Sequence, residues 1–208
     1  MNSFKHYYFQ TIIRPRRTFD ALVVDPRRLR YGIGALAIMA VLYTFVYIFL
    51  IFGGGQPFKP WLAIPDEVYY RYNVFFVAPS MFMAWILAAG VTQLLGHLFA
   101  GQGSFEDTLS VLGFGIGIAS WSTAIHDLLT SFLGAVHIID QREYEHILNS
   151  PTLWRTLLWI QFAIYLLWFL LLFSKGIGAA QRLRRGPAIF LGVIAFVIYQ
   201  FVFLIFNR

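Results

Sequence analysis

The sequence contains no cysteine and few charged residues. Without cysteine the chain has no disulfide, no thiolate nucleophile and no cysteine metal site. Charged residues make up 12% of the chain and hydrophobic residues 59%, with a mean hydropathy of +0.66. A soluble domain carries about 25% charged residues. This chain has too little charge to cover a soluble surface, so we predict that a lipid bilayer is its solvent.

Motifs of common enzymes and metal sites are also missing. The chain has no Gly-x-Ser-x-Gly elbow and no His-Glu-x-x-His pair, and no lysine follows the glycines at Gly101 and Gly103 as in a phosphate-binding loop. His126, His137 and His146 could gather with nearby acids, but their spacing matches no metal motif. We therefore expect a non-enzymatic protein with no cofactor, no metal and no nucleic-acid partner.

Five apolar runs predict an all-α polytopic membrane protein with five transmembrane helices. A helix rises about 1.5 Å per residue, so about 20 apolar residues cross the roughly 30 Å hydrocarbon core. The third run is too long for one straight apolar helix, and residues 140–150 after it read as an exposed loop. The expected spans are about 32–52, 74–99, 109–139, 153–173 and 188–206.

Residues 1–31 form a basic N-terminal segment ahead of this five-helix domain, residues 32–208. Pro15 forbids one continuous helix here, and Asp25 before Pro26 is typical of a helix start. The segment is expected to lie on the membrane surface against anionic lipids, or to form a solvated positive tail. No cleavable signal peptide is apparent, so the first span is expected to direct insertion.

The distribution of Lys and Arg predicts the orientation. With the N-terminus in the cytoplasm, eleven of the sixteen Lys and Arg residues lie inside. Positive residues favour the cytoplasmic side. An odd number of spans then places the C-terminus outside, with Lys59 and Arg208 among the five outer cations.

The hairpin GQGSFED at 101–107 precedes the third span. Ser104 followed by Asp107 predicts a capping box, in which each side chain accepts a hydrogen bond from the other residue's backbone N–H. Ser104, Phe105 and Asp107 are therefore candidate functional residues on the cytoplasmic face. The alternatives are a purely structural hairpin and a recognition loop.

Small residues recur in the third span. Gly113 and Gly117 are four residues apart, as are Gly115 and Ala119. Such pairs let helix backbones approach closely in lipid. Three interpretations remain: packing within the subunit, a dimer face, or an unwound segment that lines a ligand path.

His126 and Asp127 are the polar pair at the far end of this span. An intramembrane carboxylate is a functional hypothesis by default. Asp127 lies 18 residues after Leu109, about 27 Å along a helix, which places it near the outer interface. Asp127 is either a functional carboxylate or an interfacial carboxylate whose hydrogen bonds are satisfied.

Three stretches carry a resemblance to a known family. They are RPRRTFDALVVDPRR at 14–28, IPDEVYYRYNVFFVAPS at 64–80 and, most specifically, GQGSFEDTLSVLGF at 101–114. The chain resembles the Yip family of membrane proteins (Ypt/Rab-interacting-protein domain), in its bacterial branch. The resemblance implies a five-helix fold. Eukaryotic members associate with small GTPases in the early secretory pathway.

These observations lead to one functional expectation and one alternative. The first is a non-enzymatic membrane protein that binds a partner protein or organises lipid through its cytoplasmic face. The alternative is a small oligomeric transporter or channel for a lipid or small molecule, lined by the glycine-rich third helix. The expected location is the inner cell membrane, or the Golgi or ER membrane in a eukaryote, with a membrane-protein partner or a homo-oligomer.

Overall fold

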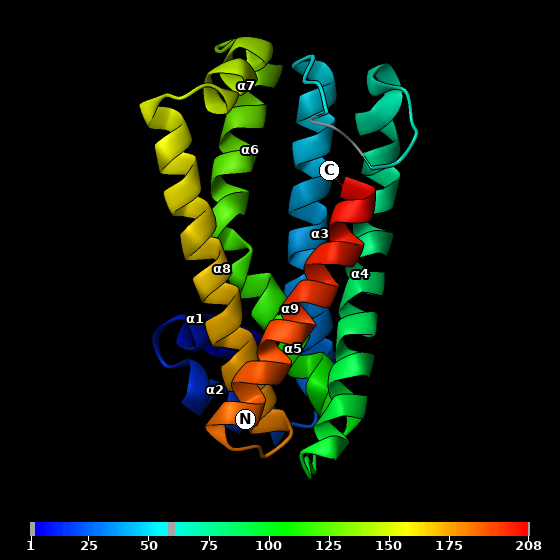
Figure 1. The fold of residues 1–208 in the computed structure, drawn as a ribbon, viewed down its shortest axis with the longest axis vertical. Coiled ribbons are helices and arrows are strands. Elements are labelled where there is room, and N and C mark those ends of the chain that lie inside the picture. The colour runs from blue at the N-terminus through cyan, green and yellow to red at the C-terminus, as the bar shows by residue number, and fades with distance from the viewer. Residues whose placement is uncertain (1–2, 58–60, 208) are drawn as a thin grey trace.

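The computed structural model describes residues 3–57 and 61–207, and these fold into helices joined by short connections (Figure 1). Lys59 and Arg208, which entered the orientation prediction, lie outside the described residues. The helices are α1 (Phe4–Ile13), α2 (Pro15–Val23), α3 (Arg28–Phe52), α4 (Asp66–Leu98), α5 (Phe105–Ala119), α6 (Trp121–Ala135), α7 (Gln141–Asn149), α8 (Leu153–Ala180) and α9 (Arg185–Asn207).

Four of these helices, α3, α4, α8 and α9, are long and apolar enough to cross a membrane alone. The fifth candidate span is the pair α5 and α6, which bends by 45° at Ser120. The all-α polytopic fold predicted from the sequence is confirmed, and the over-long third span is two helices. All backbone groups of a spanning segment must be paired within the protein, so an apolar run this long can only be helical.

Three of the spanning helices, α3, α4 and α8, pack against α5. α3 lies against α4, α5 and α6, while α9 lies against α4 and α8. Every residue of α5 from Ser110 to Ala119 is buried. Aromatic residues such as Phe169 and Tyr199, with stacked rings at 5.8 Å between centroids, fill the space between α8 and α9.

The N-terminal helices α1 and α2 pack against one end of this bundle (Figure 1). Pro15 begins α2 and separates it from α1, as the sequence predicts. Phe19 and Leu22 of α2 are completely buried. The hydroxyl of Tyr8 in α1 donates a hydrogen bond to the carbonyl of Gly117 at 2.8 Å. The basic segment is thus part of the folded body.

Three local predictions were wrong. Asp25 does not cap α3, because its carboxylate accepts the N–H of Arg27 in the preceding turn and α3 begins at Arg28. The proline and tyrosines of residues 65–72 predict an interfacial turn before the second span, but these residues begin one 33-residue helix, α4, with Pro79 in its interior. Residues 140–150 are mostly helical, because Asp140 caps α7 by accepting the N–H groups of Arg142 and Glu143.

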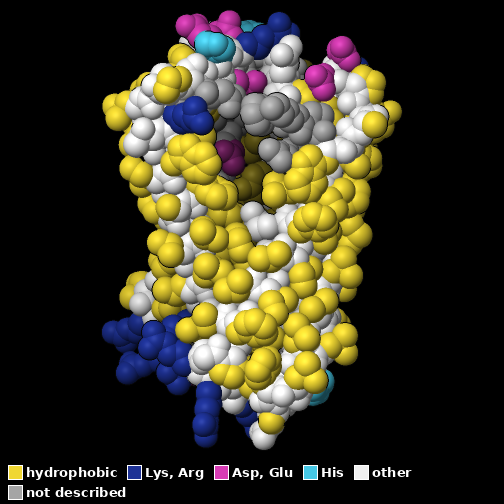
Figure 2. Space-filling view, in the orientation of Figure 1, with side chains coloured by type: hydrophobic (Ala, Val, Ile, Leu, Met, Phe, Trp, Pro, Cys, Tyr) yellow, Lys and Arg dark blue, Asp and Glu magenta, His cyan; other side chains and the backbone are white. Residues whose placement is uncertain are grey.

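The two ends of the bundle differ in charge (Figure 2). Hydrophobic side chains cover the middle of the face shown, a large group of Lys and Arg lies at its lower end, and the Asp and Glu in view lie at its upper end beside a few Lys or Arg. We call the end with α1, α2, the 101–107 hairpin and the α8–α9 connection the basic end. The opposite end, with α7 and the start of α4, is the acidic end.

Candidate functional site at the basic end

The 101–107 hairpin is held by the capping box that the sequence predicted. Ser104 Oγ accepts the N–H of Asp107 at 3.1 Å, and Asp107 Oδ2 accepts the N–H of Ser104 at 3.0 Å. Arg28 at the start of α3 pairs with Asp107 Oδ1 at 2.6 Å and with Glu106 at 3.5 Å. Phe105 beside them is 42% exposed. The carboxylates of Glu106 and Asp107 are therefore paired with Arg28, while the ring of Phe105 is exposed on the surface.

A buried polar network fixes the hairpin from within. Gln181 at the end of α8 is fully buried and donates to Thr108 Oγ1 at 2.6 Å and to Gln93 Oε1. Thr108 donates to Gln93 Oε1 at 2.8 Å, and Gln93 Nε2 donates to the carbonyl of Gly103. Sequence reasoning did not single out these three side chains. The available signal was an isolated polar residue in an apolar helix, since such groups hydrogen bond across helices.

Gly113 and Gly117 lie where α5 meets α3. A methyl group on Gly113 would fall 2.7 Å from the carbonyl oxygen of Gly32, and one on Gly117 would fall 2.5 Å from that of Ala35. Both distances are far below van der Waals contact. The two backbones therefore touch at positions where only glycine fits.

His126 and Asp127 lie elsewhere, in α6 beyond the bend. His126 Nδ1 is 3.1 Å from Asp127 Oδ1, and its Nε2 is 2.7 Å from the hydroxyl of Tyr144 in α7. The hairpin, glycine and polar-pair candidates thus occupy three separate places along the third span. Among residues 3–57 and 61–207, no three His, Asp or Glu side chains are grouped so that they could hold a metal ion.

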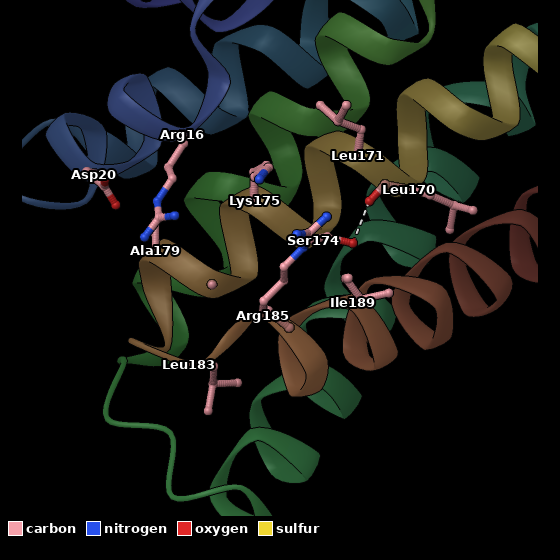
Figure 3. Close-up of a pocket in the computed structure, with 12 residues that line it drawn as sticks. Arg16, Asp20, Leu170, Leu171, Ser174, Lys175, Ala179, Leu183, Arg185 and Ile189 are labelled. Atoms are coloured by element: carbon pink, nitrogen blue, oxygen red, sulfur yellow. Dashed lines mark hydrogen bonds between the residues drawn. The ribbon is translucent and has the colours of Figure 1, made fainter.

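The basic end also carries a cavity of about 420 Å³ between α2, α8 and α9 (Figure 3). Three cations line it: Arg16 from α2, Lys175 from α8 and Arg185 from α9. Figure 3 shows Arg16 and Arg185 reaching toward α8 from opposite sides. One acid, Asp20, is also present. The sequence placed positive charge in this region but could not show that three helices bring it to one cavity.

The floor of this cavity is apolar. Leu170 and Leu171 lie about one turn closer to the bundle centre than Lys175, and Ile189 lies about one turn beyond Arg185. Ser174 uses its hydroxyl locally, donating to the carbonyl of Leu170 at 2.6 Å. Within the described part of the chain, Arg16, Lys175 and Arg185 make no ion pair. The cavity thus offers unneutralised positive charge above an apolar surface.

Comparison with known proteins agrees with this architecture. The family model of the Yip1 domain matches residues 9–206, from α1 to the end of α9. No curated protein and no solved structure gives a match. The match spans nearly the whole chain and all of its candidate spans, so the chain is a multi-pass membrane protein that belongs to the Yip1 domain family.

Proposed function

We propose that this protein is a non-enzymatic membrane protein that binds anionic phospholipid at its basic end and so organises the membrane for a partner. The observation that carries the proposal is the cavity between α2, α8 and α9, with Arg16, Lys175 and Arg185 around an apolar floor. Basic pockets between membrane helices on the cytoplasmic side suit anionic headgroups. The positive-inside tendency supports placing this end in the cytoplasm.

The cations lie toward the end of the bundle and the apolar lining residues lie nearer its centre, and this order fits a lipid rather than a soluble anion. A phosphate held by the three cations would leave acyl chains free to run along Leu170, Leu171 and Ile189 toward the bilayer centre. A partner protein would then meet the lipid headgroup, the exposed Phe105 and the hairpin on one surface. The location would be the inner cell membrane, or the Golgi or ER membrane of a eukaryote.

The transporter alternative receives less support. Its expected lining was the glycine-rich segment, but Gly113 and Gly117 pack directly on α3. Neither lines the cavity at the basic end.

Bound lipid tests the proposal. The protein is extracted gently with its native lipids, and anionic phospholipid retained per protein is measured by native mass spectrometry. Arg16→Gln, Lys175→Gln and Arg185→Gln are combined in one variant. Arg17→Gln, Arg30→Gln and Arg184→Gln form the control, because these three cations lie at the same end, are exposed and do not line the cavity.

We expect the cavity variant to lose most of its retained anionic lipid and the control to keep it. Since both variants lose the same net charge, a difference between them reports the cavity and not general attraction to the surface. Equal retention by the two variants would contradict the proposal.

A further inference from the structure

The span formed by α5 and α6 has an interrupted backbone hydrogen-bond ladder at its bend. Ser120 donates its N–H back to the carbonyl of Ile116, and the carbonyl of Ser120 itself accepts the N–H groups of Thr123 and Ala124. Among the described residues, no backbone N–H reaches the carbonyl of Gly117, one helical turn before α6 begins. A carbonyl inside a span needs a partner within the protein, because lipid supplies none.

Tyr8 of α1 supplies that partner. Its hydroxyl donates to the carbonyl of Gly117 at 2.8 Å and accepts the indole N–H of Trp121 at 2.5 Å. Gly117 belongs to the last turn of α5, and Trp121 is the first residue of α6. One hydroxyl group therefore bridges the two sides of the bend, and it comes from a residue 109 positions before Gly117 in the chain.

Aromatic neighbours fix the ring of Tyr8 in this position. Its centroid lies 5.4 Å from that of Phe4 in α1 and 6.1 Å from that of Phe114 in α5. Phe4 also meets the ring of Tyr31 in α3 at 5.8 Å. α1 is therefore seated against α3 and α5, with the hydroxyl of Tyr8 directed at the bend.

Two further side chains serve the same break. The hydroxyl of Ser122 donates to the carbonyl of Ala119 at 2.7 Å, and Gln161 of α8 donates to the carbonyl of Ser122 at 2.9 Å. Sharp kinks arise where a side chain inserts into the helical ladder, as the Tyr8 hydroxyl does here. Of these contacts, the pair made by Tyr8 joins both sides of the bend to α1.

The far side of the bend lines a cavity of about 420 Å³ near the acidic end, among α3, α4, α6, α7, α8 and α9. Polar residues of α6 recur along this cavity at helical spacing, so they share one side of the helix. This polar stripe comprises Thr123, His126, Asp127, Thr130 and Ser131. Figure 2 shows a hollow in the upper half of the molecule. The direction of α6 therefore shapes the cavity.

The bend also keeps α6 alongside α3. Tyr43 of α3 shares a hydrogen bond with Thr123 at 2.9 Å, and Phe49 of α3 meets Phe132 edge to face, with 5.4 Å between the ring centroids. Because α6 leaves α5 at 45°, a straighter span would carry α6 along the direction of α5 and away from these contacts with α3. Straightening would therefore widen the cavity on its α3 side.

From this arrangement we propose that α1 is a clasp that holds the α5–α6 span bent and so limits the opening of the cavity near the acidic end. The Gly117 carbonyl has two alternative donors: the Tyr8 hydroxyl in the bent span, and the backbone N–H of Trp121 in a straighter one. Both satisfy the carbonyl, so the span has two arrangements and the seating of α1 chooses between them. This inference does not depend on the anionic-lipid site.

Distances between two spin labels, in the full-length protein in nanodiscs, test the clasp. Because the chain contains no cysteine, two introduced cysteines are its only labelling sites. Phe52→Cys in α3 and Leu129→Cys in α6 report the separation of these helices, and both positions are exposed. Phe52→Cys with Phe75→Cys in α4 is the reference pair, because neither position lies beyond the bend.

Tyr8→Phe removes the bridging hydroxyl and keeps the ring. Tyr7→Phe is the matched control, because it removes a hydroxyl of the same helix that bonds to Asp25 and to the carbonyl of Ala21 and not to the bend. Trp121→Phe removes only one of the two bonds that Tyr8 makes.

We expect Tyr8→Phe to shift the α3–α6 distances toward longer values. The population of the longer distances should rise roughly two- to tenfold for each hydrogen bond lost. Trp121→Phe should give a smaller shift, while Tyr7→Phe and the reference pair should match the parent protein. Unchanged α3–α6 distances in Tyr8→Phe, or an equal change in Tyr7→Phe, would overturn the proposal.

The reactivity of a thiol inside the cavity tests the consequence. Thr130→Cys places the thiol in the polar stripe, and Ile138→Cys places one on the exposed surface beyond α6 as the control. With Tyr8→Phe added, a water-soluble thiosulfonate should modify Thr130→Cys roughly two- to tenfold faster and Ile138→Cys at the same rate as before. An unchanged or slower reaction at Thr130→Cys would refute control of the cavity by α1.

Discussion

Gly117 of α5 lies so close to Ala35 of α3 that a methyl group on Gly117 would stand 2.7 Å from the Ala35 Cβ. Lipid gives helices no hydrophobic reason to associate, so close contact between small residues must supply the attraction. A leucine on a lipid-facing surface would avoid the roughly 1 kcal/mol that glycine costs in a helix. The glycine is therefore explained by its contact with α3.

Replacing Gly117 should destabilise the monomer. Gly117→Leu must push α5 away from α3, and overpacking of this kind costs about 1–3 kcal/mol in soluble cores. The melting temperature of the purified monomer measures the effect. Gly90→Leu is the control, because a side chain on Gly90 meets nothing within 4 Å, so it should be neutral or slightly stabilising. Loss of a cross-linked dimer with unchanged monomer stability would instead mean that the face is intermolecular.

Removal of the Gln181 amide should destabilise the hairpin. Gln181→Leu removes the amide that donates to Thr108 and Gln93, which keep only their other hydrogen bonds, and losing a buried donor of this kind costs about 1–3 kcal/mol. Denaturation in a mild detergent measures the loss. Combining it with Thr108→Val and Gln93→Leu should recover part of the stability, because the side chains that lost their donor are then apolar and only the Gly103 carbonyl lacks its former partner. A triple variant less stable than the single one would contradict this account.

Stability should depend on pH through Asp25, which lies between α2 and α3. Burial raises the pKa of the Asp25 carboxyl, but hydrogen bonds from Arg27 and Tyr7 outweigh it and hold the pKa below its ordinary value. A lowered folded pKa contributes stability above the unfolded pKa, about 3.9, and loses it as pH falls through the folded value. Melting curves of the wild type and Asp25→Asn should differ at pH 7 and converge below about pH 4. A gap that stays constant with pH would exclude this role for the charge.

Asp127→Asn should leave the fold nearly intact. The Asp127 side chain is 37% exposed and pairs with His126, and such partly solvated pairs contribute about 0–1 kcal/mol. Thermal melting in detergent checks this. A large fall in melting temperature would point to a buried structural partner for the carboxylate.

Reporter fusions test the orientation. With the N-terminus inside and five spans, a reporter fused after residue 208 should be active only if it works outside the cytoplasm. α1 and α2 lie at the basic end, and α9 starts there and runs toward the acidic end (Figure 1), so the chain begins at the basic end and ends nearer the acidic end. Activity of a cytoplasmic reporter at this position would reverse the assignment of the basic end.

The sequence alone determined the class of the protein and several of the places where its helices start and break. Long apolar runs specify spanning helices because lipid satisfies no backbone group. The capping box of Ser104 and Asp107 and the break at Pro15 are equally local, so neighbouring residues were enough to predict them. The same reasoning failed at Asp25. Its carboxylate accepts the N–H of Arg27 in the turn before α3 and does not cap α3 itself.

Only the tertiary structure decided which distant residues meet. The Gln93–Thr108–Gln181 network joins three helices, and the basic cavity joins Arg16 to Lys175 and Arg185 across more than 150 residues of chain. The polar stripe of α6 was visible in the sequence as separate residues, but its cavity exists because α6 bends at Ser120 while α7 folds over it. Helix packing in lipid depends on the shapes of facing surfaces, and no local pattern specifies which surfaces face each other.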